Sequence, residues 1–223
     1  MSKRPTTKKS GSAVGAVSQP DAEIRYPRRT ERRRKTRAKL LEVAAGLFST
    51  EGYGPTTMQA IADGADVHVT TLFTHFKSKS ELARSLAAGE LDDLRARAFQ
   101  SREAQSVFAF VTAETLALAE MLEASDKPAH TLWYALATDD ELAFAWSEYD
   151  RERKSVIADY VAAEFGLDRQ KELRPDIVAA LLLASAFLPL QRWVENPRRG
   201  KLAAEVKEAM RMGEAAARTL LEA

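Results

Sequence analysis

Residues 56–76, TTMQAIADGADVHVTTLFTHF, contain two short apolar repeats with a turn between them. The apolar residues of each repeat recur at the three- and four-residue spacing of a helix. Thr56 and Thr57 precede the first repeat, and either of them can cap a helix. The residues between the repeats, DGAD at 63–66, have the composition of a tight turn. This order predicts a helix-turn-helix. The side chains expected to be buried are Met58, Ile61, Ala62, Val67, Leu72, Phe73 and Phe76.

The second repeat also carries short polar side chains, which suit the major groove of a DNA duplex. Groove reading needs small polar groups that reach base edges and methyl groups that meet thymine methyls. Phosphate contacts need hydroxyls, amines and free backbone N–H groups. The expected base contacts are His68, Val69, Thr70, Thr71 and Thr74, and the expected phosphate contacts are Thr57, His75, Lys77 and Lys79. A position at the edge of the core is the alternative for Thr71.

Helical patterns continue on both sides of this motif. Upstream, apolar spacing predicts a helix from about 31 to 51 that glycines then stop. Downstream, Ser78 and Glu81 form a capping box that opens a longer helix. We expect three parts: a disordered basic arm at 1–28, a helix-turn-helix domain at 29–77 and a helical body at 78–223.

The body is predicted to be entirely helical. Its segments run from 104 to 124, from Pro128, from a capping box at Thr138 and Glu141 to Gly166, from Pro175, and from about 200 to 222. Neither strand alternation nor an internal repeat is present, so the predicted fold class is all-α. A three-helix head precedes a larger helical body.

The charge of the chain is strongly asymmetric. Residues 1–39 hold thirteen Lys and Arg against three acidic residues, which is +10, and the remainder carries −9. A basic arm on an acidic body indicates a polyanionic partner, with a solvated tail as the alternative. Arg32 and Arg33 are expected to contact DNA. Arg25, Arg28 and Arg29 either enter the adjacent minor groove or only steer the encounter.

Composition excludes several classes. The chain has no cysteine, hence no disulfide or thiolate metal site, and the first residues lack the apolar core of a signal peptide. The sequence contains no run of about 18 apolar residues, so no membrane span is predicted. We therefore expect a cytoplasmic protein.

Residues 52–82 resemble the DNA-binding head of the TetR/AcrR family of bacterial transcriptional regulators. The matching elements are Gly52-Tyr53, Thr56-Thr57, Ile61-Ala62, Thr71-Leu72-Phe73, His75-Phe76 and Ser78-Lys79 with Leu82. Four positions depart from the family pattern. Asp66 replaces the turn glycine, and His68 replaces the serine or threonine that starts the recognition helix. Thr70 replaces a small residue, and Phe73 replaces a tyrosine whose hydroxyl reaches a phosphate.

The resemblance implies a body that encloses an effector pocket and pairs with a second subunit. The pocket candidates are Trp133, Phe144, Tyr149 and Phe187, for which plain core packing is the alternative. A palindromic operator requires two heads and therefore a homodimer. The expected contacts lie on the last two helices, at Ile177, Leu181, Ala184, Leu188, Met210 and Leu220. The alternative is that the apolar helix near 177–190 is the buried centre of a monomer.

These observations favour a ligand-responsive homodimeric repressor that binds a palindromic operator and leaves it when a small-molecule effector binds. The alternative is a DNA-binding regulator or architectural protein without an effector. An enzyme is not expected, because no catalytic triad order or glycine-rich phosphate loop is present. No cofactor or metal is expected either. His68 and His75 lie seven residues apart, whereas a helical metal pair is usually separated by four.

Overall fold

The computed structural model describes residues 27–124, 135, 139–195 and 201–222. The chain divides into two compact units, residues 1–38 and 39–223. Nearly all of the predicted basic arm lies outside the described residues, as do the helix start at Pro128, the pocket candidate Trp133 and the predicted cap Thr138.

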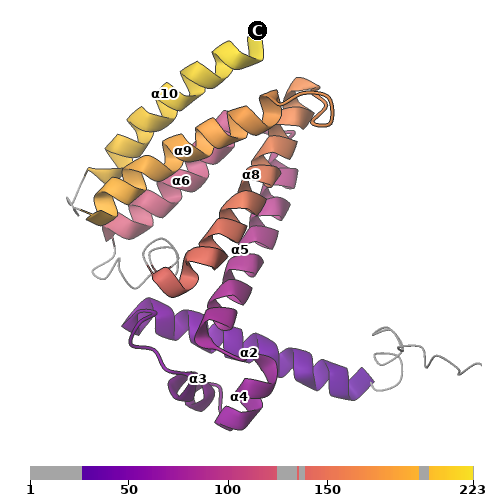
Figure 1. Cartoon of the computed structure of the whole chain (residues 1–223), viewed down its shortest axis with the longest axis vertical. Coiled ribbons are helices and arrows are strands. Elements are labelled where there is room, and N and C mark those ends of the chain that lie inside the picture. The colour runs from indigo at the N-terminus through magenta and orange to yellow at the C-terminus, as the bar shows by residue number, and fades with distance from the viewer. Residues whose placement is uncertain (1–26, 125–134, 136–138, 196–200, 223) are drawn as a thin grey trace, which may run out of the picture. The chain divides into compact units, whose positions relative to one another are not determined.

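Helices account for all regular structure in the described ranges (Figure 1), which confirms the all-α class. The elements are α2 (Pro27–Glu51), α3 (Met58–Gly64), α4 (Val69–His75), α5 (Lys79–Ser101), α6 (Val107–Ala124), the 3-10 helix η2 (Asp140–Leu142), α8 (Ala143–Phe165), α9 (Arg174–Glu195) and α10 (Leu202–Glu222).

The first unit is described only through the beginning of α2. This helix starts at Pro27, four residues before the predicted start, and proline suits a first helical turn. Glu31 forms ion pairs with Arg34 at 3.1 Å and with Lys35 at 3.7 Å. The Arg34 guanidinium beside it lowers the pKa of Glu31. These pairs support the helix where its basic residues repel one another.

The apolar side chains of the helix-turn-helix form one core with the end of α2 and the start of α5. Leu40, Phe48, Ile61, Leu72 and Phe76 are each at most 1% exposed. Leu142 and Ala145 of the η2–α8 segment belong to the same cluster. The head core therefore includes a contribution from the body, which the sequence did not predict.

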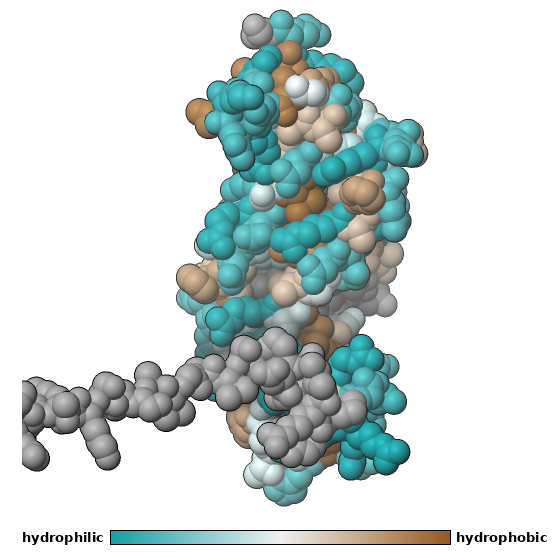
Figure 2. Space-filling view, turned by 90° about the vertical axis from the view of Figure 1, so that its right-hand side faces the viewer, coloured by the Kyte–Doolittle hydropathy of each residue, from teal (hydrophilic) through white to brown (hydrophobic). Residues whose placement is uncertain are grey.

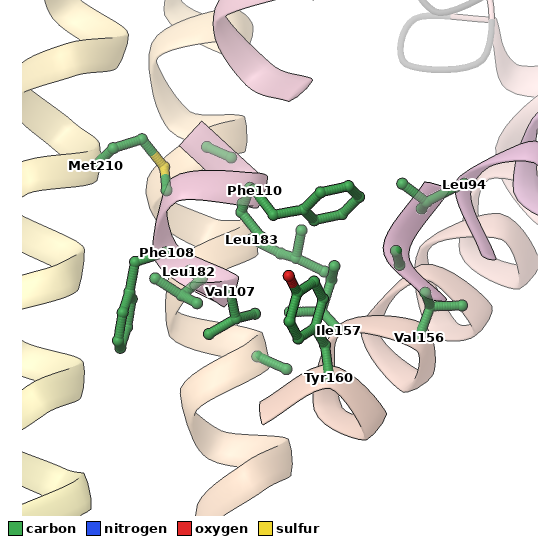
Figure 3. Close-up of a cluster of buried hydrophobic side chains, with 14 of the residues drawn as sticks. Leu94, Val107, Phe108, Phe110, Val156, Ile157, Tyr160, Leu182, Leu183 and Met210 are labelled. Atoms are coloured by element: carbon green, nitrogen blue, oxygen red, sulfur yellow. The ribbon is translucent and has the colours of Figure 1, made fainter. Parts of the chain in front are cut away.

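The body has a second core, built around α9. This helix packs against α8, α10 and α6. Figure 3 shows Tyr160 and Phe110 at the centre of this cluster, and their ring centroids lie 5.5 Å apart. The Tyr160 hydroxyl donates to the backbone oxygen of Gln105 at 2.8 Å. Gly166 ends α8 with φ of 65°, as predicted, because glycine adopts the left-handed conformation readily.

Apolar composition alone would allow α9 to cross a membrane, since Arg174–Trp193 is long and hydrophobic enough. The core helix of a soluble protein passes the same test, and Val178, Leu182 and Ala186 are completely buried in the body. The face of the molecule in Figure 2 is mainly hydrophilic, with apolar side chains in small separate patches. This distribution is ordinary for a protein surface.

One predicted dimer contact is corrected by the fold. Met210 is 2% exposed and belongs to the body core. In Figure 3 its side chain extends from α10 toward the other buried residues. Its side chain is thus occupied within its own subunit and cannot meet a partner.

Candidate nucleic-acid interface

The two threonines before α3 have different roles. Thr57 is the N-cap, and its hydroxyl accepts a hydrogen bond from the N–H of Ala60 at 3.1 Å. Thr56 is buried and donates to the backbone oxygen of Gly52 at 2.7 Å. The cap thus belongs to Thr57, whose exposed position leaves it at the surface of the head.

The turn between α3 and α4 depends on Asp66. Its φ is 56°, and it is the one non-glycine residue with positive φ in the described part of the chain. The N–H of Asp66 donates to Asp63 O, and the next N–H, of Val67, donates to Ala62 O, both at 3.0 Å. Aspartate tolerates this conformation better than most residues. Asp66 therefore takes a left-handed conformation at the position where the resemblance led us to expect glycine.

His68 begins α4 with an imidazole cap. Its Nδ1 accepts a hydrogen bond from the backbone N–H of Thr70 at 3.3 Å and lies 2.8 Å from the Thr70 hydroxyl. The sequence indicated a poor cap at this position, because histidine is not among the preferred N-cap residues. The ring nitrogen nevertheless takes the role of the usual hydroxyl oxygen.

Exposure divides α4 into an inner and an outer face. Leu72 and the following Phe76 are completely buried, whereas Thr70 and Thr74 are exposed. Phe73 was expected in the core, but it is 49% exposed and lies on the outer face. Its position follows from helical spacing, since residues 70, 73 and 74 share one side. Val69, Thr71 and His75 lie at the boundary between the faces, with intermediate exposure.

The two lysines after α4 differ in their environments. The Lys79 ammonium donates to the backbone oxygens of Tyr53 and Gly54 at 2.8 and 2.9 Å and lies 4.3 Å from the centre of the Tyr53 ring. Two of its three N–H donors therefore bind backbone oxygens inside the head. The spacing of residues in the sequence does not indicate these hydrogen bonds. The Lys77 side chain is exposed.

The start of α5 has the predicted cap in a slightly different form. The Ser78 hydroxyl accepts from the N–H of Glu81 at 3.2 Å. The carboxylate of Glu81 reaches back to the N–H of Lys77 at 2.7 Å, one residue before the cap. Both contacts satisfy backbone donors at the helix start.

The predicted arginine contacts lie in the first unit. Arg32 and Arg33 are both exposed on α2. The hydroxyl of Thr36 donates to the backbone oxygen of Arg32 at 3.0 Å. The side chains of both arginines thus face solvent, available to a polyanion.

A cavity of about 280 Å³ lies between α5 and α8. Of the predicted pocket residues, Tyr149 lines it, and burial raises the pKa of its phenol. Phe144 is 72% exposed and does not line it. Phe187 contacts Trp146, whose ring also meets Tyr149, with centroid distances of 5.3 and 6.0 Å. The other lining residues are Arg84, Ala87, Ala88, Leu91, Arg95, Ala145, Glu148 and Glu152.

The polar groups of the cavity are unevenly paired. Arg95 forms ion pairs with Asp92 and Glu152 at 2.9 and 2.8 Å. Arg84 and Glu148 have no ion pair among the described residues. The cavity thus combines an apolar lining with one cation and one anion that a ligand can address.

Five of the six predicted dimer residues are at least partly exposed. Ile177 is 49% exposed and Leu188 is 55% exposed on α9, and Leu220 is 38% exposed on α10. Ala184 is exposed and Leu181 is partly buried. Exposed aliphatic side chains on two adjoining helices are typical of an association surface.

Comparison with known proteins agrees with this architecture. Residues 40–86 match the family described as bacterial regulatory proteins, tetR family, and residues 106–217 match the MftR C-terminal domain. The transcriptional regulator TcmR of Streptomyces glaucescens is 29% identical over 174 residues, covering 74% of this chain and 76% of TcmR.

Two further relatives resemble parts of the chain or its fold. The transcriptional repressor KstR2 of Mycobacterium tuberculosis is 46% identical over 61 residues, 27% of this chain and 30% of KstR2. The fold also resembles Thermus thermophilus FadR, a repressor solved with lauroyl-CoA, with a TM-score of 0.58, 21% identity and coverage of 80% and 93% of the two chains.

The matched family regions extend over both the helix-turn-helix and the body, and the matched proteins are regulators rather than enzymes. The chain belongs to the TetR family of bacterial transcriptional regulators.

Proposed function

We propose that this regulator is a cytoplasmic homodimeric repressor that binds a palindromic operator through α4 and is released by a small-molecule effector. The observation that carries the proposal is the outer face of α4. Thr70, Phe73 and Thr74 are exposed there, while Leu72 and Phe76 hold the helix to the head core. The small side chains of Thr70 and Thr74 on an anchored helix fit a major groove.

Phosphate contacts are proposed around this face. Thr57 caps α3, His75 is the last residue of α4 and Lys77 follows α4. The capped start of α5 adds backbone N–H groups. Lys79 is assigned a positioning role first, because its ammonium ties α5 to Tyr53 and Gly54. Arg32 and Arg33 are proposed to add salt-dependent affinity. The proposed domain division remains 29–77 for DNA binding and 78–223 for effector binding and dimerisation.

Dimerisation is proposed through α9 and α10. The surface consists of Ile177, Leu181, Ala184, Leu188 and Leu220, with Met210 removed for the reason given above. Exposing these aliphatic groups to water is unfavourable, and a symmetric partner covers the same groups on both subunits. Two heads per molecule match two half-sites of a palindrome.

The effector site is proposed at the cavity between α5 and α8. Tyr149 packs against both the head core and the body core, so a ligand beside it touches the boundary between them. A ligand with an apolar part and an anionic group suits the alanines and Arg84, which forms no ion pair within the described ranges. Acyl thioesters are the first class to screen, because the related FadR was solved with lauroyl-CoA. Such a ligand changes operator affinity if it binds the operator-binding conformation and the released conformation with different affinities.

The test is operator binding by the full-length protein after selection of a site from random duplexes. The variant is Thr74→Glu, which places a carboxylate on the outer face of α4. We expect affinity for the selected site to fall by at least about tenfold, because the lost contact and the added charge both oppose binding. Ala113→Glu, on the exposed side of α6, is the matched control and should bind as the wild type does.

The outcomes separate the proposal from its alternatives. Enrichment of a palindrome, bound as two protomers per duplex, supports a dimeric operator-binding regulator. Flat affinity across duplexes at all salt concentrations would instead identify an architectural protein. If lauroyl-CoA and other acyl thioesters neither raise the melting temperature nor weaken binding to the selected site, that effector class is wrong.

A further inference from the structure

The hydrogen-bond geometry of α4 determines what its threonines can offer to a base. Thr74 is exposed, and its hydroxyl donates to the backbone oxygen of Thr71 at 2.7 Å. A hydroxyl has one hydrogen and two lone pairs. With its hydrogen engaged by the helix, Thr74 presents only acceptor lone pairs and a methyl group outward.

His68 likewise makes the Thr70 hydroxyl an acceptor toward the groove. Because its Nδ1 accepts the backbone N–H of Thr70, that nitrogen carries no proton. The Thr70 hydroxyl, 2.8 Å from the same nitrogen, must therefore be the donor in their contact. Its remaining lone pairs point elsewhere, so Thr70 is also an acceptor toward the groove.

The rest of the outer face is apolar or neutral. Phe73 is 49% exposed between the two threonines, and Val69 is partly exposed. The helix Val69–His75 contains no Arg, Lys, Asn or Gln. It therefore lacks the bidentate side chains that most often read guanine or adenine.

We infer that α4 reads A·T base pairs, through acceptor contacts from Thr70 and Thr74 to adenine amino groups and methyl contacts to thymine. In the major groove an A·T pair presents the adenine N6 amino donor and the thymine C5 methyl together. A G·C pair also presents one donor, on cytosine N4, and it has two acceptors, as an A·T pair does. The thymine methyl is therefore the group by which this partly apolar face distinguishes the two pairs. This inference rests on the proposed function, since it specifies the base composition of the operator that α4 contacts.

The experiment uses the full-length protein and the duplex it selects from a random library. The adenines of the half-site core are replaced one at a time by purine, which lacks the N6 amino group. Thymines are replaced by uracil, which lacks the methyl. We expect at least about a fivefold loss of affinity at the contacted positions for each replacement, the lower end of what one altered base pair costs.

Two threonine variants assign the contacts. Thr74→Val keeps the shape of the side chain but removes the acceptor, so it should bind the purine-substituted and the adenine-containing site equally. Thr74→Ser keeps the acceptor but removes the methyl, so it should retain the adenine preference and lose the response to uracil. Thr70→Val and Thr70→Ser give the same comparison at the second position. Cooperative thermal unfolding of each variant controls for folding.

The possible outcomes are distinct. Tight, salt-sensitive binding to a selected site with a G·C core would overturn this inference and leave the proposed function standing. The same holds if wild-type affinity is unchanged by every purine replacement, a measurement that needs no variant to fold. Failure to select any site at low salt would remove the proposed function itself.

Discussion

Removal of the Tyr53 hydroxyl gives a sharp test of how the head is packed. The Tyr53 side chain is 3% exposed, and its Oη has no hydrogen-bond partner among the described residues. The ring itself is well packed, with the Phe48 centroid at 5.2 Å and the Lys79 ammonium at 4.3 Å. Tyr53→Phe keeps these ring contacts and deletes only the unpaired hydroxyl.

The expected effect is stabilisation. A buried polar group without a partner costs about 1–3 kcal/mol relative to its solvated state. Deleting the group removes that cost, so the free energy of unfolding should rise by about 1 kcal/mol. For a chain of this length the melting temperature should rise by about 2–4 °C. A buried tyrosine that has a partner should behave in the opposite way.

Tyr160 provides that matched control. It is completely buried, and its hydroxyl donates to Gln105 O at 2.8 Å. Tyr160→Phe should lower the free energy of unfolding by about 1 kcal/mol, because the hydrogen bond is lost. Both variants are measured by urea unfolding followed by circular dichroism at one protein concentration, since dimerisation makes stability concentration-dependent.

Tyr53 should also make the free energy of unfolding depend on pH. Burial, together with the nearby carboxylates of Glu141 and Asp139, raises the pKa of Tyr53 to about 12. The unfolded phenol has a pKa of about 10, so it ionises first as pH rises. The unfolded state then binds fewer protons, and stability falls between about pH 10 and 12, whereas below about pH 10 this contribution is complete. Tyr53→Phe should remove the part of the decline in unfolding free energy above pH 10 that comes from Tyr53.

Two results would contradict this account of Tyr53. If Tyr53→Phe lowers the free energy of unfolding as much as Tyr160→Phe does, the Tyr53 hydroxyl has a partner in solution. An unchanged decline in stability above pH 10 in the variant would show that Tyr53 does not titrate as described.

Further substitutions, centred on Gly213, Ser78 and Asp66, test the packing and the ends of the helices. Gly213→Ala should lower the urea midpoint by an amount equivalent to about 1–3 kcal/mol. The added Cβ would lie 2.2 Å from Ser185 Oγ and 2.8 Å from Ser185 Cβ. The double variant Gly213→Ala with Ser185→Gly should recover part of the lost stability. Ser78→Ala should cost about 1 kcal/mol in the same assay, since it removes the cap of α5, and an unchanged midpoint would mean that the cap is dispensable. Asp66→Gly should raise the melting temperature slightly, by the equivalent of up to about 1 kcal/mol, whereas Asp66→Val should lower it, and equal melting temperatures would contradict the left-handed turn.

Local sequence patterns predicted the helices and their ends well, because those features depend on neighbouring residues. Thr57 and Ser78 cap helices where their spacing indicated, and Gly166 ends α8 in the left-handed conformation. Asp66 adopts positive φ where a glycine was expected from the resemblance. Each of these features is decided by hydrogen bonds or dihedral angles within a few residues.

Tertiary packing decided which side chains are free, because helical spacing groups residues into faces but does not say which face is buried. Phe73 lies on the exposed face of α4, whereas Phe76 follows the helix in extended backbone and is buried in the head. Met210 is apolar and was therefore expected at the interface, but its side chain packs into the body core of its own subunit. Lys79 looks like a phosphate contact in the sequence, and it is the fold that brings the distant Tyr53 carbonyl to its ammonium.

The sequence by itself therefore determined the all-α class, the helix-turn-helix and the positions of its caps, since periodicity and capping chemistry are local. Only the tertiary structure decided which face of α4 is exposed and where the cavity between α5 and α8 lies. These properties depend on which atoms from separate turns and helices meet, and a linear pattern of residue types does not contain that information.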